Sequence, residues 1–122
     1  MGYQGMLSVD LLKDQTVDET TSKPVDCRGR THVTVYLSGA GTTSSGVISI
    51  EESMPAGTPG GQVPAQSYSG TWSLISAVNA STVTGGAMAA QHLTISSYGW
   101  IRVRITTVIG GGGSISAGLV AV

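Results

Sequence analysis

Residues 98–107 read YGWIRVRITT and contain two of the six basic residues of the chain. Branched aliphatic side chains alternate here with other residues, and the aliphatic set is Ile101, Val103 and Ile105. A period of two is that of a half-buried β-strand, in which successive side chains point to opposite faces. We therefore expect the aliphatic set to face a core and Trp100, Arg102 and Arg104 to lie on the opposite face.

The composition of the whole chain also favours strands. Charged residues make up 11% of the 122 residues, against about 25% in an ordinary soluble domain. Phe is absent, and Val and Ile, which pack well on a pleated sheet, supply much of the apolar mass. Because the centres of interfaces are depleted in charge, this neutrality favours a surface covered by other subunits. A soluble sandwich faced with Ser and Thr is the alternative.

Charge and hydropathy argue against several classes of partner. A net charge of −1 creates no field that would attract nucleic acid. No apolar run approaches the roughly 20 residues of a membrane-spanning helix, and the N-terminal segment lacks the pattern of a signal peptide. A single cysteine, Cys27, excludes an internal disulfide. We expect synthesis in a host cytoplasm, with no nucleic acid or membrane as partner.

Further segments with strand character are separated by turn-forming residues. The clear strands are expected at 31–38, 47–53, 71–79, 91–96, 100–109 and 114–122, with shorter or ambiguous ones at 6–12, from Val25 and around Val83. In the strand at 71–79, one face is expected to carry Trp72, Leu74, Ser76 and Val78. No segment has a persuasive helical period.

These elements predict an all-β protein, an antiparallel β-sandwich of the jelly-roll or immunoglobulin-like kind, with an extended N-terminal arm. Residues 1–30 are assigned to the arm and its short strands, and residues 31–122 to the sandwich domain. Within the arm, residues 13–23 hold five charged side chains and little to bury, so we expect an exposed loop there.

The residues that usually carry catalysis are not arranged for it. Glu51 and Glu52 are adjacent on a strand, so they point to opposite faces and do not form a facing carboxylate pair. His32, His92 and Cys27 lack the spacing of metal ligands, and a lone cysteine is more often a small buried apolar residue. We predict no enzymatic activity, no catalytic residue, no metal site and no cofactor.

Two kinds of surface contact remain open. Tyr68 and Tyr98 lie in a loop and at a corner, where exposed aromatic rings would suit a glycan, although aromatic residues in sandwiches usually fill the core. Trp100, Arg102 and Arg104 would suit a subunit or capsid interface, because Trp and Arg are common binding anchors. The acids within the chain that offer these arginines an internal pairing instead are Asp26, Glu51 and Glu52.

Three stretches together resemble small β-sandwich virion proteins of tailed bacteriophages: GVISIEES (46–53), YSGTWSLIS (68–76) and SSYGWIRVRITTVIGGGGSISAGLVAV (96–122). The resemblance implies a structural protein that decorates or cements the capsid exterior. It also implies that the major capsid protein and copies of the chain itself, commonly in a homotrimer, are its partners. The alternatives are a carbohydrate-binding module that contacts a glycan, or a head–tail or tail fitting of the virion.

Overall fold

The computed structural model describes residues 6–17, 20–27, 30–53, 72–94 and 99–122. The strands are β1 (Leu7–Gln15), β2 (Val25–Asp26), β3 (His32–Ala40), β4 (Ser45–Ser53), β5 (Ser73–Asn79), β6 (Met88–Thr94), β7 (Trp100–Gly110) and β8 (Ser114–Ala121). A short 3₁₀ element, η2 (Ala80–Gly86), joins β5 to β6. The predicted all-β class is confirmed.

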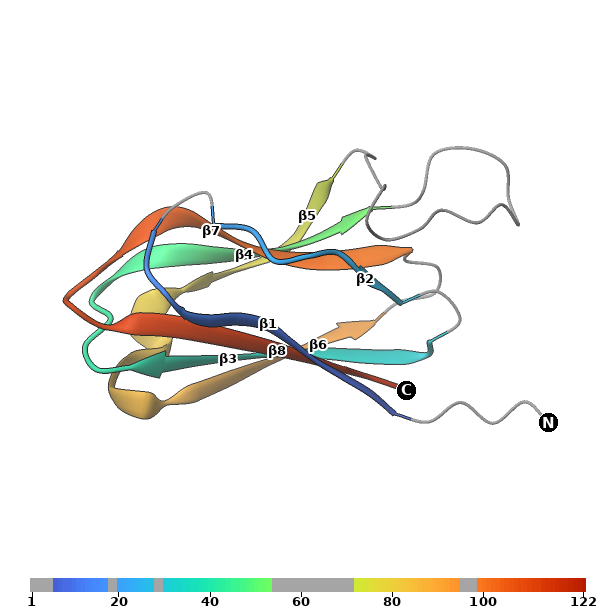
Figure 1. Ribbon diagram of the computed structural model, residues 1–122, viewed down its shortest axis with the longest axis horizontal. Coiled ribbons are helices and arrows are strands. Elements are labelled where there is room, and N and C mark those ends of the chain that lie inside the picture. Colours follow the sequence, from blue (N-terminus) through green and yellow to red (C-terminus); the bar gives the residue numbers. More distant parts are fainter. Residues whose placement is uncertain (1–5, 18–19, 28–29, 54–71, 95–98) are drawn as a thin grey trace.

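The strands form two antiparallel sheets that face each other, as Figure 1 shows. One sheet has the order β1-β8-β3-β6 and is called sheet A here, and the other has the order β2-β7-β4-β5 and is called sheet B. The chain can be described as one long antiparallel ribbon made of the pairs β1–β8, β2–β7, β3–β6 and β4–β5. The ribbon is folded so that successive pairs belong alternately to sheet A and sheet B. This strand order is that of a jelly roll, one of the two sandwich types expected from the sequence.

The core lies between the sheets and is built from the inward positions of the central strands. The predicted aliphatic set of β7 is fully buried, and β3, β4 and β8 face it with the same alternation. The core side chains of these four strands are Val33, Val35, Leu37, Ile48, Ile50, Ile101, Val103, Ile105, Ile109, Ile115, Ala117, Leu119 and Ala121. Burying a side chain of this size contributes about 1.5–3 kcal/mol, which makes this layer the main source of stability.

Two local expectations are corrected. Leu74 was expected on the same face of β5 as Val78, but it is 60% exposed while Val78 is buried. The pairing with β4 shifts between Ile50 and Glu51, which leaves Ile75 as an extra residue and reverses the faces beyond it. The segment around Val83 forms η2 rather than a strand, and its kink still places Val83 fully inside the core.

Residues 7–17 and 20–26 are attached to the two sheets of the sandwich. β1 is the edge strand of sheet A, paired with β8, and β2 is the edge strand of sheet B, paired with β7. Between them, the backbone N–H groups of Ile105 and Ile109 donate to the carbonyl oxygens of Thr20 and Thr16, both at 2.9 Å. Thr16 and Thr20, in the segment 13–23 that was expected to form an exposed loop, are therefore held along β7 by backbone hydrogen bonds, although Lys13 and Lys23 are exposed.

Gly113, the residue directly before β8, has no room for a side chain, which gives a test of the fold. A Cβ atom at Gly113 would lie inside van der Waals contact of the carbonyl oxygens of Ala40 and Thr42, whereas one at Gly118 would lie 3.5 Å from the Val9 oxygen. We expect Gly113→Ala to lower the free energy of unfolding by about 1–3 kcal/mol. Gly118→Ala is the matched control and should leave it unchanged or raise it by up to about 1 kcal/mol. Equilibrium urea unfolding of both variants measures the difference, and equal midpoints would contradict the packing at this turn.

Candidate functional site

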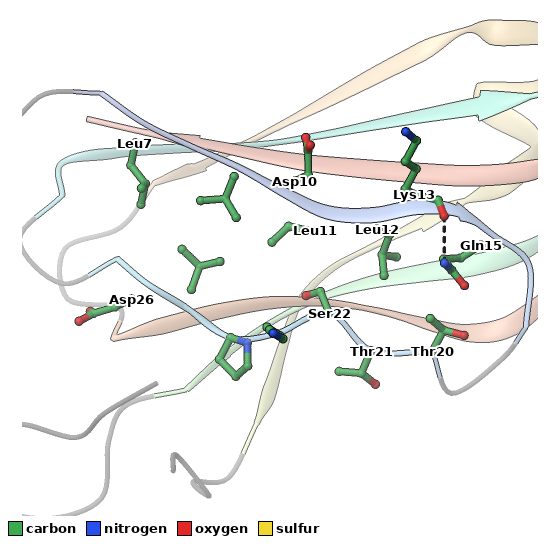
Figure 2. Close-up of a pocket in the computed structure, with 14 residues that line it drawn as sticks. Leu7, Asp10, Leu11, Leu12, Lys13, Gln15, Thr20, Thr21, Ser22 and Asp26 are labelled. Carbon is green, nitrogen blue, oxygen red and sulfur yellow. Dashed lines mark hydrogen bonds between the residues drawn. The ribbon is translucent and has the colours of Figure 1, made fainter. Parts of the chain in front are cut away.

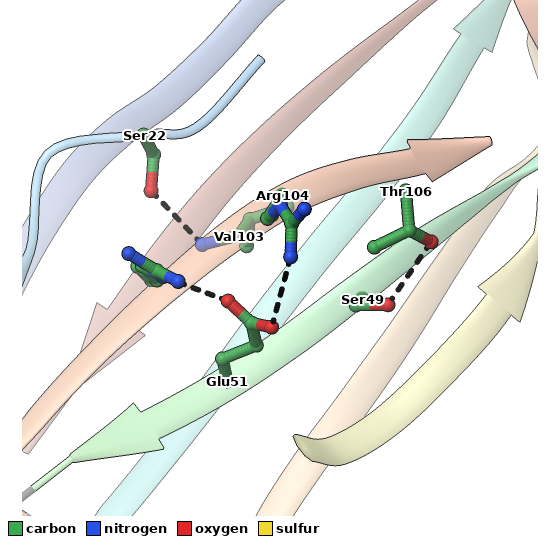
Figure 3. A network of polar contacts seen from close by, with 7 residues as sticks. Ser22, Ser49, Glu51, Val103, Arg104 and Thr106 are labelled. Carbon is green, nitrogen blue, oxygen red and sulfur yellow. Dashed lines mark hydrogen bonds and ion pairs between the residues drawn. The ribbon is translucent and has the colours of Figure 1, made fainter. Parts of the chain in front are cut away.

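The outer face of sheet B carries a compact charged network. The Arg102 Nε atom donates to Glu51 Oε1 at 2.7 Å, and Arg104 Nη1 lies 3.9 Å from Glu51 Oε2 (Figure 3). The Glu51 side chain is 11% exposed, against 21% for Arg102 and 28% for Arg104. One carboxylate therefore lies between two guanidinium groups and is shielded from water by them.

The strand register explains this geometry. Glu51 on β4 lies directly opposite Arg102 on β7, and the next outward pair along the strands is Ser49 opposite Arg104. Arg104 therefore reaches Glu51 on the diagonal, a separation that long side chains span. On the other side, the guanidinium carbon of Arg102 lies 4.3 Å from the ring centroid of Trp72, within cation–π range. The network joins β4, β7 and the start of β5.

This arrangement explains why Arg102 and Arg104 point to the same face of β7, because both form ion pairs with Glu51. The internal pairing with Glu51, one of the two alternatives left open by the sequence, is present, while pairing with another subunit stays a prediction. The network holds no second carboxylate or imidazole that would pair with Glu51 for acid–base chemistry, so among the described residues it is suited to contact rather than catalysis.

Trp100, Tyr68 and Tyr98 are the other residues that were predicted to contact a partner. Trp100 was expected to expose its ring beside the arginines, but it is 1% exposed. It lies between Asp26 of β2 and Ser53 of β4, inside the sheet and not at its margin, because β2 pairs with this end of β7. Its ring is therefore a structural element of the folded chain and offers no stacking surface. Tyr68 and Tyr98 lie outside the described residues.

A groove that the sequence analysis did not predict runs along the open side of the sandwich, between β1 and the segment 20–26 (Figure 2). It has a volume of about 760 Å³. Leu7, Val9 and Leu11 line it from β1 and are only partly buried. The sequence predicted a short or ambiguous strand at 6–12 but no groove beside it, because a groove depends on which segment lies across from the strand.

A shallow hollow of about 310 Å³ lies on the outer face of sheet A. Tyr36, 36% exposed, stands at its centre on β3, directly opposite Gly118 on β8 and Ala90 on β6. Both of these cross-strand neighbours are small, and part of the Tyr36 side chain is exposed to the hollow. Polar and charged groups complete the rim, and those that line the hollow are Asp10, Lys13, Ser38 and Ser116.

The potential nucleophile and metal ligands do not form a site. Cys27 is 1% exposed, and its burial, helped by the nearby Asp26 carboxylate, raises the pKa of its thiol to about 11. The thiol is therefore protonated at neutral pH and unreactive. His92 Nδ1 lies 3.0 Å from the Thr34 hydroxyl on the outer face of sheet A. The described part of the chain contains no group of three or more possible metal ligands and no helix long and apolar enough to cross a membrane.

Comparison with known proteins identifies the fold but no family. The crystal structure of the SPBc2 prophage-derived protein YomS is similar, with a TM-score of 0.60 and 13% sequence identity, over 97% of this chain and 94% of that chain. A protein of Bacillus endospore appendages, described as disulfide-linked pili, gives a TM-score of 0.41 and 12% identity over 98% and 89% of the two chains. No family and no curated protein matches the sequence. The likeness to YomS shows that a prophage-derived protein shares this fold along nearly the whole chain.

The two adjacent glutamates test the charged network. Glu51→Gln removes the carboxylate that lies between Arg102 and Arg104, so we expect the free energy of unfolding to fall by about 1–3 kcal/mol. Glu52→Gln is the matched control: Glu52 pairs with Ile101 on the other face, and burial raises the pKa of its carboxyl, which means that the folded state disfavours its charge. The control should be neutral or slightly stabilising at pH 7. Denaturant unfolding of both variants distinguishes them, and an equal loss in both would argue against the network.

Proposed function

We propose that this protein is a structural component of a tailed-phage virion, which acts by protein–protein contact. The observation that carries the proposal is the whole-chain similarity in fold to the prophage-derived protein YomS. The site chemistry agrees, because the outer face of sheet B pairs its charges internally and the thiol of Cys27 is buried. The jelly roll is also a recurrent architecture of viral capsid proteins, a supporting analogy at the level of the fold.

Within that class, the protein decorates or cements the exterior of the capsid. The resemblance in sequence to small virion proteins supports this location, and the low charge supports a surface that other proteins cover. The major capsid protein and further copies of the chain are the proposed partners. A repeated, symmetric arrangement on the particle would allow each contact patch to be modest in area, because many weak contacts act together.

Purified particles test this function. Virions from a lysate of the host that carries the gene should contain the protein at a fixed ratio to the major capsid protein, measured by quantitative mass spectrometry after a density gradient. Electron microscopy with a labelled antibody should then place it on the capsid exterior. Label at the tail alone would favour the head–tail or tail fitting, and recovery of the protein only from the soluble fraction would contradict a virion role.

Carbohydrate recognition is the second candidate function, and the hollow around Tyr36 is the observation that favours it. A sugar ring presents an apolar face that can lie against an uncovered aromatic ring, while its hydroxyl groups donate to carboxylates and serine oxygens. Tyr36 supplies the ring, and Asp10, Ser38 and Ser116 supply oxygen atoms around it. This hollow involves neither of the tyrosines suggested by the sequence.

Titration with neutral sugars tests this second function. Two-dimensional NMR of the protein with a panel of hexoses and disaccharides should show shifts confined to the hollow. Tyr36→Ala should weaken binding by about tenfold or more, whereas Tyr36→Phe, which keeps the ring, should retain most of it. Absence of shifts at millimolar concentrations of every sugar, or equal affinity of the two variants, would count against a glycan site.

A further inference from the structure

The four sheet edges of this sandwich differ in how they are protected against pairing with another chain. An exposed edge strand presents unpaired backbone groups, and proteins usually block such edges with bulges, charges or proline. The edge strand β1 has two register irregularities and an Asp14 residue at φ 51°, and its charged side chains are Asp10, Lys13 and Asp14. The edge formed by β2 is two residues long and follows Lys23 and Pro24. In β5, Ile75 interrupts the register.

β6 has none of these features. Its seven residues, MAAQHLT, pair with β3 without a register shift, and they include no proline, acid, lysine or arginine. Within the described part of the chain, β3 is its only neighbouring strand. It is thus a regular and uncharged edge of the kind that other chains can extend.

The backbone groups that β6 leaves open can be identified. Gly39 donates to the carbonyl oxygen of Ala87, and His32 and Val122 exchange both of their backbone hydrogen bonds. Odd-numbered residues of β3 therefore point their N–H and C=O groups at β6, where they meet odd-numbered partners such as Gln91. The residues of β6 whose N–H and C=O groups point away from β3 are consequently Met88, Ala90, His92 and Thr94.

Two exposed apolar side chains lie on the edge strands at this side of the sandwich, one on the outer face of each sheet. Met88 is 67% exposed at the start of β6, and Leu74 is 60% exposed on β5, the edge strand of the other sheet. The Ser76 hydroxyl donates to the Gln91 side-chain oxygen at 3.1 Å, so β5 and β6 lie next to each other across the two sheets. No Asp, Glu, Lys or Arg occurs in β5, η2 or β6. This side therefore combines an open backbone edge, apolar side chains and no like charges to keep a second copy away.

We propose that two copies of this chain associate through β6, which pairs antiparallel with β6 of the second copy and joins the two A sheets into one continuous sheet. In one register, the backbone N–H and C=O groups of all four residues that point away from β3 form hydrogen bonds with the second copy. In that register Gln91 lies opposite Gln91 of the partner subunit on the two-fold axis. Ala90 then lies opposite the partner's His92, and Met88 opposite the partner's Thr94. Four pairs that each exchange two bonds give about eight new backbone hydrogen bonds.

The second copy is favoured over a different partner because this edge is complementary to itself. An antiparallel two-fold pairing never sets two charged side chains of β6 against each other, and small alanine side chains on both faces keep the approach of the strands free of obstruction. A closed two-fold interface also uses up the exposed edge, which prevents further growth of the sheet. The proposal depends on the geometry of β6 and is separate from a role in the virion; its two-fold symmetry differs from the trimer that the sequence resemblance implies.

Mass measurement is the first test. Light scattering coupled to size exclusion should give twice the 12.3 kDa mass of the chain at micromolar concentration and a monomer on dilution. Ala90→Pro removes an outward N–H in each copy, so it should raise the dissociation constant by about tenfold or more while leaving the thermal midpoint of the diluted monomer nearly unchanged. Ala90→Ser, which keeps the N–H group, is the control and should remain a dimer.

A cross-link tests the register even if Ala90→Pro fails to fold. Gln91→Cys sets two thiols opposite each other on the axis at a separation that a disulfide spans, while Cys27 is buried, so mild oxidation should give a covalent dimer. Ala89→Cys lies on the same face but four residues from its symmetry mate, and it should stay uncross-linked. A wild-type monomer at all concentrations, a trimer unaffected by Ala90→Pro, or equal cross-linking of the two cysteine variants would overturn the proposal. A monomer that is nevertheless found on particles would overturn this interface alone, and a dimer absent from particles would overturn the virion role alone.

Discussion

The structure depends on the burial of branched aliphatic side chains between four central strands, β3 and β8 in sheet A and β4 and β7 in sheet B. Each of these strands has a neighbour on both sides, but three of the four ribbon pairs join segments that are distant in sequence. Because β1 must find β8 and β2 must find β7, neither sheet is complete until the two ends of the chain meet. The strand pairs and the buried core therefore have to form together, and such non-local contacts slow folding.

The charged network on sheet B adds specificity to that layer. Ile48 and Ile50 fix which face of β4 points inward, but a slip of two residues against β7 would keep the same face inward. In the observed register Glu51 lies opposite Arg102 and diagonal to Arg104, whereas a two-residue slip in one direction brings it opposite Trp100 and leaves only Arg102 on a diagonal. A partly buried carboxylate without adequate partners is costly, so the network disfavours a slip in that direction.

The sequence predicted the regular part of the fold because its signal is local. Val33, Val35 and Leu37, or Ile101, Val103 and Ile105, alternate along their own strands, and the structure buries all of them. The predictions that were wrong depend on contacts between residues distant in sequence. The exposure of Leu74 follows from a bulge against β4, and the burial of Trp100 follows from where β2 pairs, neither of which a single strand reveals. Glu51 was among the candidate partners of the arginines, but only the register selects it over Asp26 and Glu52.

The low charge of the chain is also unevenly distributed, and this bears on how the molecule meets others. Outside the sheet B network, nearly all acidic and basic residues fall between positions 10 and 30, in β1, in β2 and in the segments before and after β2. β3, β5, β6 and β8 contain no Asp, Glu, Lys or Arg. The charges therefore border the side of the sandwich where an apolar groove lies open between the sheets, and they hinder strand pairing there. The opposite side has no such barrier, so a molecule that is nearly neutral as a whole still distinguishes an edge that repels other chains from one that can accept them.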